Sequence, residues 1–80
     1  MYKFEPMETE ILKHLYAYWE LDINQGWEKV SKLDKSVVDT LYMAELVDKQ
    51  VVQKTVRLST RGVGAVLFGL SNADKIYNLL

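Results

Sequence analysis

The chain has 80 residues with 49% hydrophobic and 26% charged side chains and a formal net charge of −1, a balance that predicts one small globular domain and argues against disorder. It contains no cysteine, which excludes disulfides and thiolate metal sites, and a small domain without such crosslinks often relies on oligomerisation. The sequence shows neither a signal-peptide pattern nor an apolar run of about 18 residues, so we expect a soluble, cytoplasmic protein.

The first predicted element is an amphipathic helix over residues 6–20. Pro6 follows Glu5 at the first helical position, where the missing N–H of proline costs nothing. The apolar residues that recur at helical spacing are Met7, Ile11, Leu12, Leu15, Tyr18 and Trp19. We expect most aromatic side chains in the core, with Trp19 and Trp27 packed between this helix and the next one.

Two shorter helices are predicted next, over residues 25–33 and 35–45, with Asp34 as the N-cap of the second of them. The apolar face of residues 35–45 centres on Leu41. A rotation of about 100° per residue places a mostly polar set on the opposite side, namely Lys35, Ser36, Asp39 and Met43. Two short helices separated by a tight turn are typical of a helix-turn-helix.

Residues 47–58 predict a β-hairpin, because valine, threonine and leucine alternate there with polar residues. We expect its tip near Gln53 and Lys54, where no Asn-Gly or Asp-Gly pair fixes the turn. Ser59 or Thr60 can then cap a helical segment over residues 60–80. The sequence therefore predicts a single α+β domain in the order helix, helix, helix, hairpin, helix.

Two segments beside the predicted hairpin resemble those of winged helix-turn-helix proteins: Leu46-Val47 before it and Leu58-Ser59-Thr60-Arg61-Gly62 after it. The proteins that the chain resembles include MarR- and PadR-like regulators and compact regulators of phages and archaeal viruses. The resemblance spans residues 6–70. It implies a three-helix core with a short hairpin wing, a C-terminal helix, and a first strand near residues 21–23. It also implies a homodimer that inserts its third helix into successive major grooves of double-stranded DNA and regulates transcription.

Candidate DNA contacts follow from that resemblance. They are Lys35, Ser36, Asp39 and Thr40 on the third helix, and Lys49, Lys54, Arg57 and Arg61 on the wing and its exit. Residues 51–61 contain three cations and no acid, which suits phosphate contacts. However, Asp39 would repel phosphates, and cations on an edge hairpin also discourage strand-to-strand aggregation. A winged-helix module that binds a protein, without significant DNA affinity, is therefore the alternative function.

Nothing in the sequence predicts an enzyme, a cofactor or a metal site. His14 is the only histidine, and we interpret it as a solvated side chain on the polar side of the first helix. No spacing selects a catalytic pair or a calcium loop among the acids, which we assign to solvated helix faces: Glu8, Glu10, Glu20, Asp22 and Glu28. An aromatic cleft for a small molecule is a remoter option.

The C-terminal segment contains more large apolar residues than one face of a small monomer can use. We predict a two-fold dimer interface formed by Val66, Leu67, Leu70, Ile76, Tyr77 and Leu80. The alternative is that these residues fold back over the chain's own core.

Overall fold

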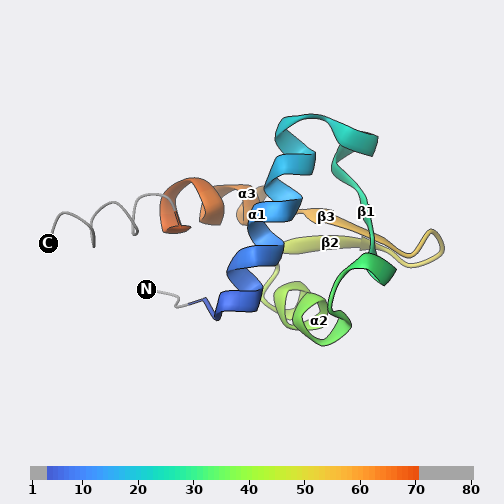
Figure 1. The fold of residues 1–80 in the computed structure, drawn as a ribbon, viewed down its shortest axis with the longest axis horizontal. Coiled ribbons are helices and arrows are strands. Elements are labelled where there is room, and N and C mark those ends of the chain that lie inside the picture. The colour runs from blue at the N-terminus through green and yellow to red at the C-terminus, as the bar shows by residue number, and fades with distance from the viewer. Residues whose placement is uncertain (1–3, 71–80) are drawn as a thin grey trace, which may run out of the picture.

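A computed structural model describes the backbone of residues 4–70 and the side chains of residues 4–68. Within that range the chain forms a small α+β domain of three α-helices and a three-stranded antiparallel sheet (Figure 1). The elements are α1 (Pro6–Glu20), β1 (Glu28–Lys29), α2 (Lys35–Met43), β2 (Val47–Gln50), β3 (Thr55–Leu58) and α3 (Thr60–Gly64). Two 3-10 turns, Ile23–Gly26 and Val30–Lys32, flank β1, and π-helical turns over Ala65–Leu70 extend α3. The α+β class predicted from the sequence is confirmed.

The first helix, α1, has the bounds that the sequence predicts. Pro6 occupies the first turn, and the carboxylate of Glu8 accepts the N–H of Glu5 at 2.8 Å, which satisfies one of the free donors at the helix start. Leu12 and Leu15 are fully buried on the inner face. Figure 1 shows α1 crossing the strands of the sheet, so its apolar stripe covers one sheet face.

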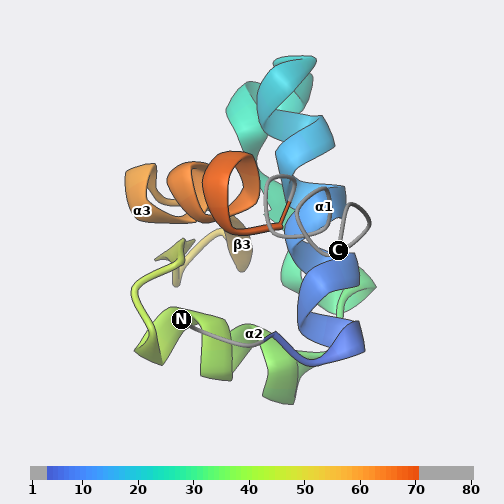
Figure 2. The same ribbon diagram turned by 90° about the vertical axis from the view of Figure 1, so that its left-hand side faces the viewer.

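The hydrophobic core lies between α1, α2 and the sheet. The largest fully buried side chains are Leu12, Leu15, Val38, Leu41 and Val56. Figure 2 shows the hairpin strands between α2 and the helical segment of residues 60–70. The strand order is β1-β3-β2, so β3 is the central strand and pairs with both of the others.

Residues 25–33 differ from the α-helix that the sequence predicts. The chain leaves α1 with four residues in the left-handed region of φ, which are Asp22 (54°), Asn24 (47°), Gln25 (57°) and Gly26 (88°). A left-handed backbone cannot continue into a right-handed helix. The chain instead makes one tight turn over Ile23–Gly26, in which Asn24 and Gln25 are left-handed.

The segment after that turn joins the sheet. Glu28 and Lys29 pair antiparallel with Val56 and Thr55 of β3, so their backbone groups bond to the sheet and not to a helix. This is also where the first strand lies, several residues after the expected position at 21–23. One α-helix, α2, therefore separates α1 from the hairpin, where the resemblance implies two.

The two tryptophans differ from their predicted role as well. Trp27 lies beneath the guanidinium of Arg57, whose Cζ is 4.5 Å from the ring centroid. Trp19 remains 45% exposed. Because no α-helix forms at residues 25–33, the helix against which these rings were expected to pack is absent.

The second helix and the hairpin follow their local sequence signals. Asp34 caps α2, and its carboxylate accepts the N–H of Val37 at 3.1 Å. α2 ends at Met43, two residues earlier than expected, because Glu45 adopts a φ of 63°. The hairpin turns over residues 51–54, with Lys54 at a φ of 55°.

Gly62 explains why glycine stands in the segment after the hairpin. Ser59 caps α3 by accepting the N–H of Gly62 at 2.9 Å. A Cβ at Gly62 would overlap the backbone carbonyl of Leu46, so α3 can approach the start of β2 only without a side chain there. The helical structure continues to Leu70, and the rest of the predicted segment 60–80 lies outside the described residues.

The predicted dimer residues divide into three groups. Val66 is 5% exposed and belongs to the chain's own core, so its assignment to an interface is corrected. Leu67 is 40% exposed. The side chain of Leu70 and all of Ile76, Tyr77 and Leu80 lie outside the described residues. None of the helices in residues 4–70 is long and apolar enough to cross a membrane.

Candidate nucleic-acid interface

A groove of about 750 Å³ separates α2 from the hairpin tip and from the segment around β1. Its charged lining consists of Lys29, Lys35, Lys49, Lys54 and Asp39. Four positive charges therefore face one negative charge, although the chain as a whole is slightly acidic. The four lysines belong to four different segments of the chain between residues 29 and 54.

The fold brings each lysine to the groove by a different route. Lys29 arrives through the pairing of β1 with β3, and Lys35 is the first residue of α2. Lys49 lies in β2, and Lys54 is the last residue of the turn. Lys29 is the site residue that the sequence interpretation missed, because a helix over residues 25–33 would have placed it elsewhere.

Asp39 neutralises part of this charge. Its carboxylate accepts a hydrogen bond from the Lys49 ammonium at 2.6 Å, and the Lys49 Nζ lies 4.7 Å from the centroid of the Tyr42 ring. The bond from Lys49, aided by the charge of Lys35, lowers the pKa of Asp39 below its ordinary value against a smaller opposing effect of burial. The other three lysines of the groove form no ion pair within residues 4–68.

Two predicted DNA contacts of α2 face another hollow. The Ser36 hydroxyl donates to the carboxylate of Asp34 at 2.7 Å, and the Thr40 hydroxyl donates to the carbonyl of Ser36 at 3.0 Å. Ser36 and Thr40 line a cavity of about 630 Å³ together with Glu5 and Glu8 of α1. Both residues are exposed, as their place on the polar face predicts, but carboxylates border them.

The two predicted arginines also lie outside the lining of the groove. Arg57 stacks on Trp27 and its Nε lies 3.9 Å from the carboxylate of Asp48. Arg61 donates to the carboxylate of Glu45 at 2.9 Å. Both cations therefore already have partners, whereas Lys54 at the tip has no ion pair within the described side chains.

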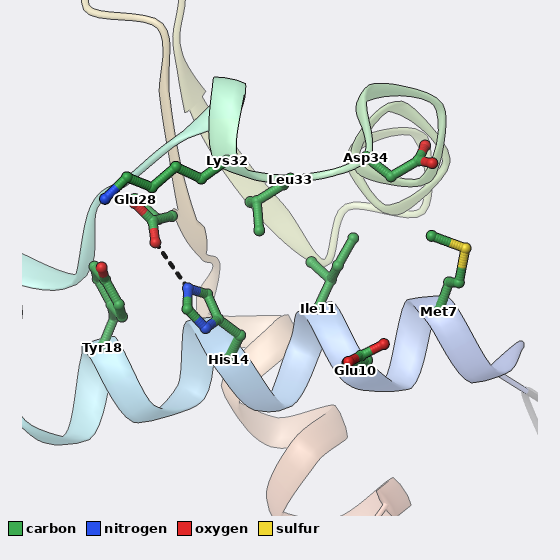
Figure 3. A pocket seen from close by; sticks show the side chains of 9 residues that line it. All are labelled: Met7, Glu10, Ile11, His14, Tyr18, Glu28, Lys32, Leu33 and Asp34. Atoms are coloured by element: carbon green, nitrogen blue, oxygen red, sulfur yellow. Dashed lines mark hydrogen bonds and ion pairs between the residues drawn. The ribbon is translucent and has the colours of Figure 1, made fainter.

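A second cavity, of about 490 Å³, lies between α1 and the segment that runs from β1 to the start of α2 (Figure 3). His14 and Glu28 meet in it, with Nε2 and Oε2 2.7 Å apart. Glu28 also accepts the N–H of Lys29 at 2.7 Å and is only 3% exposed. Glu28 therefore does not belong to a solvated helix face, which corrects that interpretation. The His14 side chain pairs with Glu28 but stays 45% exposed on α1, in agreement with its interpretation as a solvated side chain.

Opposing influences set the pKa of Glu28. Burial acts to raise it, but hydrogen bonds from His14, the Lys29 N–H and Tyr18, with the nearby charge of Lys32, outweigh burial and hold the pKa below its ordinary value. The hydrogen bond between Tyr18 and Glu28 also raises the pKa of Tyr18 above its ordinary value. The cluster is thus an ionised carboxylate surrounded by donors, which fastens β1 to α1.

Glu8 is the other acid that departs from the solvated interpretation, since it is 6% exposed beside the start of α1. Within residues 4–70, no group of three or more histidine, aspartate or glutamate side chains is placed to hold a metal ion.

Comparison of the chain with protein-family models, with curated proteins and with solved structures found no match.

Proposed function

We propose that this domain binds double-stranded DNA sequence-specifically and acts as a small transcriptional regulator. The observation that carries the proposal is the basic groove, in which four lysines and one aspartate line the space between a polar helix face and a hairpin. Lysines that converge from separate elements suit a phosphate backbone, whose neutralisation releases counterions and supplies most non-specific affinity.

The arrangement suggests how such a complex would form. α2 would enter the major groove with the exposed face that carries Lys35, Ser36, Thr40 and Met43, while the hairpin would lie on the backbone as a wing. In this arrangement we assign the domain to the winged helix-turn-helix fold, with α2 as the recognition helix. The 3-10 turn Val30–Lys32 would then replace the first helix of the motif.

A homodimer would strengthen DNA binding, because four lysines per copy give modest affinity and two copies double the phosphate contacts. The C-terminal segment from Leu67 onward remains our proposed interface. A regulator of this kind would act in the cytoplasm.

The test is a titration of a labelled 20-bp duplex by fluorescence anisotropy at two salt concentrations. With four phosphates neutralised by one copy, the dissociation constant should rise about 100-fold between about 50 and 200 mM salt, and about 10⁴-fold where both copies of a dimer bind. The double variant Lys29→Gln/Lys54→Gln loses two phosphate contacts per copy and should reduce these rises to about 10-fold and about 100-fold.

The matched control is Lys13→Gln/Lys32→Gln, which removes the same charge from exposed positions outside the groove. It should keep the steep salt dependence, as should Arg61→Gln. Equal losses in both double variants would show that affinity follows net charge and not the groove. The absence of binding at the lower salt would overturn the proposal and favour a protein-interaction module, which the exposed apolar side chains on the surface also suit.

A further inference from the structure

The turn of the hairpin, residues 51–54, is a positively charged projection. Figure 1 shows the turn extending past β1 and α2 at one end of the molecule. No acidic residue occurs between Lys49 and Arg61. The ammonium of Lys54, at the end of the turn, forms no ion pair with another described side chain. The projection therefore carries a cation that the described part of the chain does not neutralise.

The cavity beside α1 has the opposite charge. The carboxylates of Glu10, Glu28 and Asp34 line it, with Lys32 and His14 as the basic groups. Glu28 and Asp34 are already engaged, since both accept hydrogen bonds from neighbouring donors. The Glu10 carboxylate has neither a hydrogen bond nor an ion pair among the described side chains. Glu10 is therefore the acid of the cavity that remains available to an incoming cation.

The apolar parts of the two surfaces also correspond. The cavity of about 490 Å³ has an apolar wall made of Ile11, Leu33 and the half-exposed side chain of Met7. In the turn, two valines precede Lys54. Apolar side chains beside a cation thus match an apolar wall beside a free carboxylate. The turn does not line the cavity of its own chain, so a contact between these surfaces joins two molecules.

We propose that the hairpin turn of one copy enters the cavity beside α1 of a second copy, where Lys54 pairs with Glu10. Two different surfaces meet, so the contact is heterologous and links copies head to tail into a ring or a chain. A single turn covers less than the roughly 1,200 Å² of a stable interface, so the contact is weak and forms at high protein concentration. This inference does not rest on the proposed DNA function, and the contact is separate from the two-fold interface proposed from Leu67 onward.

The test exchanges the two charges and follows association of the full chain by sedimentation equilibrium, at up to about 1 mM protein. Lys54→Glu and Glu10→Lys should each weaken association about tenfold, because each places like charges against each other. The exchange variant Glu10→Lys/Lys54→Glu restores the ion pair with reversed polarity and keeps the net charge. It should associate within about threefold of the wild type, since the two substitutions act on one contact.

The matched controls are Lys13→Glu and Glu20→Lys, which make the same two charge changes at exposed positions of α1 outside the cavity. They should leave association close to that of the wild type. Raising the salt from about 50 to 200 mM should weaken association of the wild type, because the pair is screened.

A mixture gives a second readout. Glu10→Lys keeps the wild-type turn and Lys54→Glu keeps the wild-type cavity, so equal amounts of the two should associate although each alone does so poorly. The mixture of Lys13→Glu with Glu20→Lys has the same net charges. It should associate no more than the wild type, which separates the proposed contact from general attraction between oppositely charged molecules.

Three results would overturn the contact. The first is a wild type that shows no association beyond a two-fold dimer at the highest concentration. The second is an exchange variant that associates as poorly as its two parents. The third is a change in the free energy of unfolding by Glu10→Lys with no change in sedimentation, which would assign the cavity to residues of the same chain. None of these readouts uses DNA, so failure of the DNA function leaves them unaffected.

Discussion

The basic groove and the cavity beside α1 lie on the two sides of β1 and carry opposite charge. The groove has four lysines and one aspartate, whereas the cavity has Glu10, Glu28 and Asp34 with one lysine, Lys32, and His14. Adjacent residues of a strand point to opposite faces, so β1 sends Glu28 inward to His14 and Lys29 outward to the groove. A strand of two residues thus separates the charges.

This comparison teaches that net charge is a poor guide to the charge of any one surface of a small domain. The chain has a formal charge of −1, yet one of its surfaces is clearly basic. We predict that the two regions also differ in what they do: the Glu28 cluster should stabilise the fold, and the lysines of the groove should bind the DNA that we propose as the partner. Substitutions can separate these roles, because each region should change one property and leave the other unaffected.

The largest effect on stability should come from the close contact between Gly62 and the backbone of Leu46, which packs α3 against the start of β2. Gly62→Ala places a Cβ against the carbonyl of Leu46, and because backbone atoms cannot turn aside, we expect a loss of about 3 kcal/mol in the free energy of unfolding. Gly64→Ala is the control, since no atom of the described residues outside its own helix backbone lies within 4 Å of its Cβ position, and it should stabilise α3 by about 0.5 kcal/mol. Urea denaturation measures both. Equal values for the two variants would contradict the packing of α3 on Leu46.

Glu28→Ala should be the next largest and should test the cavity side of the comparison. It leaves the Lys29 N–H, His14 and Tyr18 without their shared acceptor, and we expect a loss of about 2 kcal/mol in the free energy of unfolding. Glu10→Ala removes an exposed carboxylate of the same cavity and should change stability by less than about 0.5 kcal/mol. DNA affinity should survive in any Glu28→Ala protein that remains folded. A stable Glu28→Ala domain would show that the cluster does not fasten β1 to α1.

Acidification should show the same contribution with a defined sign. The pKa of Glu28 is lower in the folded protein than its ordinary value of 4.5, so its contribution is fully present above that value and is lost as the pH falls through the folded-state pKa. The stability difference between the wild type and Glu28→Ala should therefore be constant near neutrality and shrink below pH 4.5. The lowered pKa of Asp34 and that of Asp39 act in the same direction, but they are common to both proteins and cancel in the difference. A difference that grew on acidification would contradict the ionised state of Glu28.

How far the sequence predicts each region depends on the range of the interactions that form it. α1, α2 and the hairpin follow from local signals: Pro6 at a helix start, Asp34 as a cap, and alternating valines. Lys35, Lys49 and Lys54 were therefore assigned to the correct surface elements. Whether they contact DNA stays a prediction.

Interactions between distant segments were beyond the sequence interpretation. β1 exists because Glu28 and Lys29 pair with β3, a contact that local spacing does not reveal. Burial of Glu28 and its bond to His14 follow from that pairing. A signal was nevertheless present, since the Asn24-Gln25-Gly26 turn makes an immediate helix less favourable.

The smallest effect should come from Asp39, the one acid in the basic groove. Asp39→Asn frees Lys49 from its ion pair and removes the charge that opposes phosphates, so affinity for the DNA duplex should rise about twofold to fivefold at low salt. The salt dependence should change little, because Lys49 is already counted among the four phosphate contacts of the wild type. Asp48→Asn is the control, because it removes the same charge from an exposed aspartate that faces Arg57 outside the groove.

If Asp39 instead accepts a hydrogen bond from a cytosine amino group, Asp39→Asn should lose sequence preference while it gains general affinity. Specific and random duplexes must therefore be titrated side by side. Equal gains from the two substitutions would show that only net charge matters, and the contrast between the groove and the rest of the surface would then fail for binding.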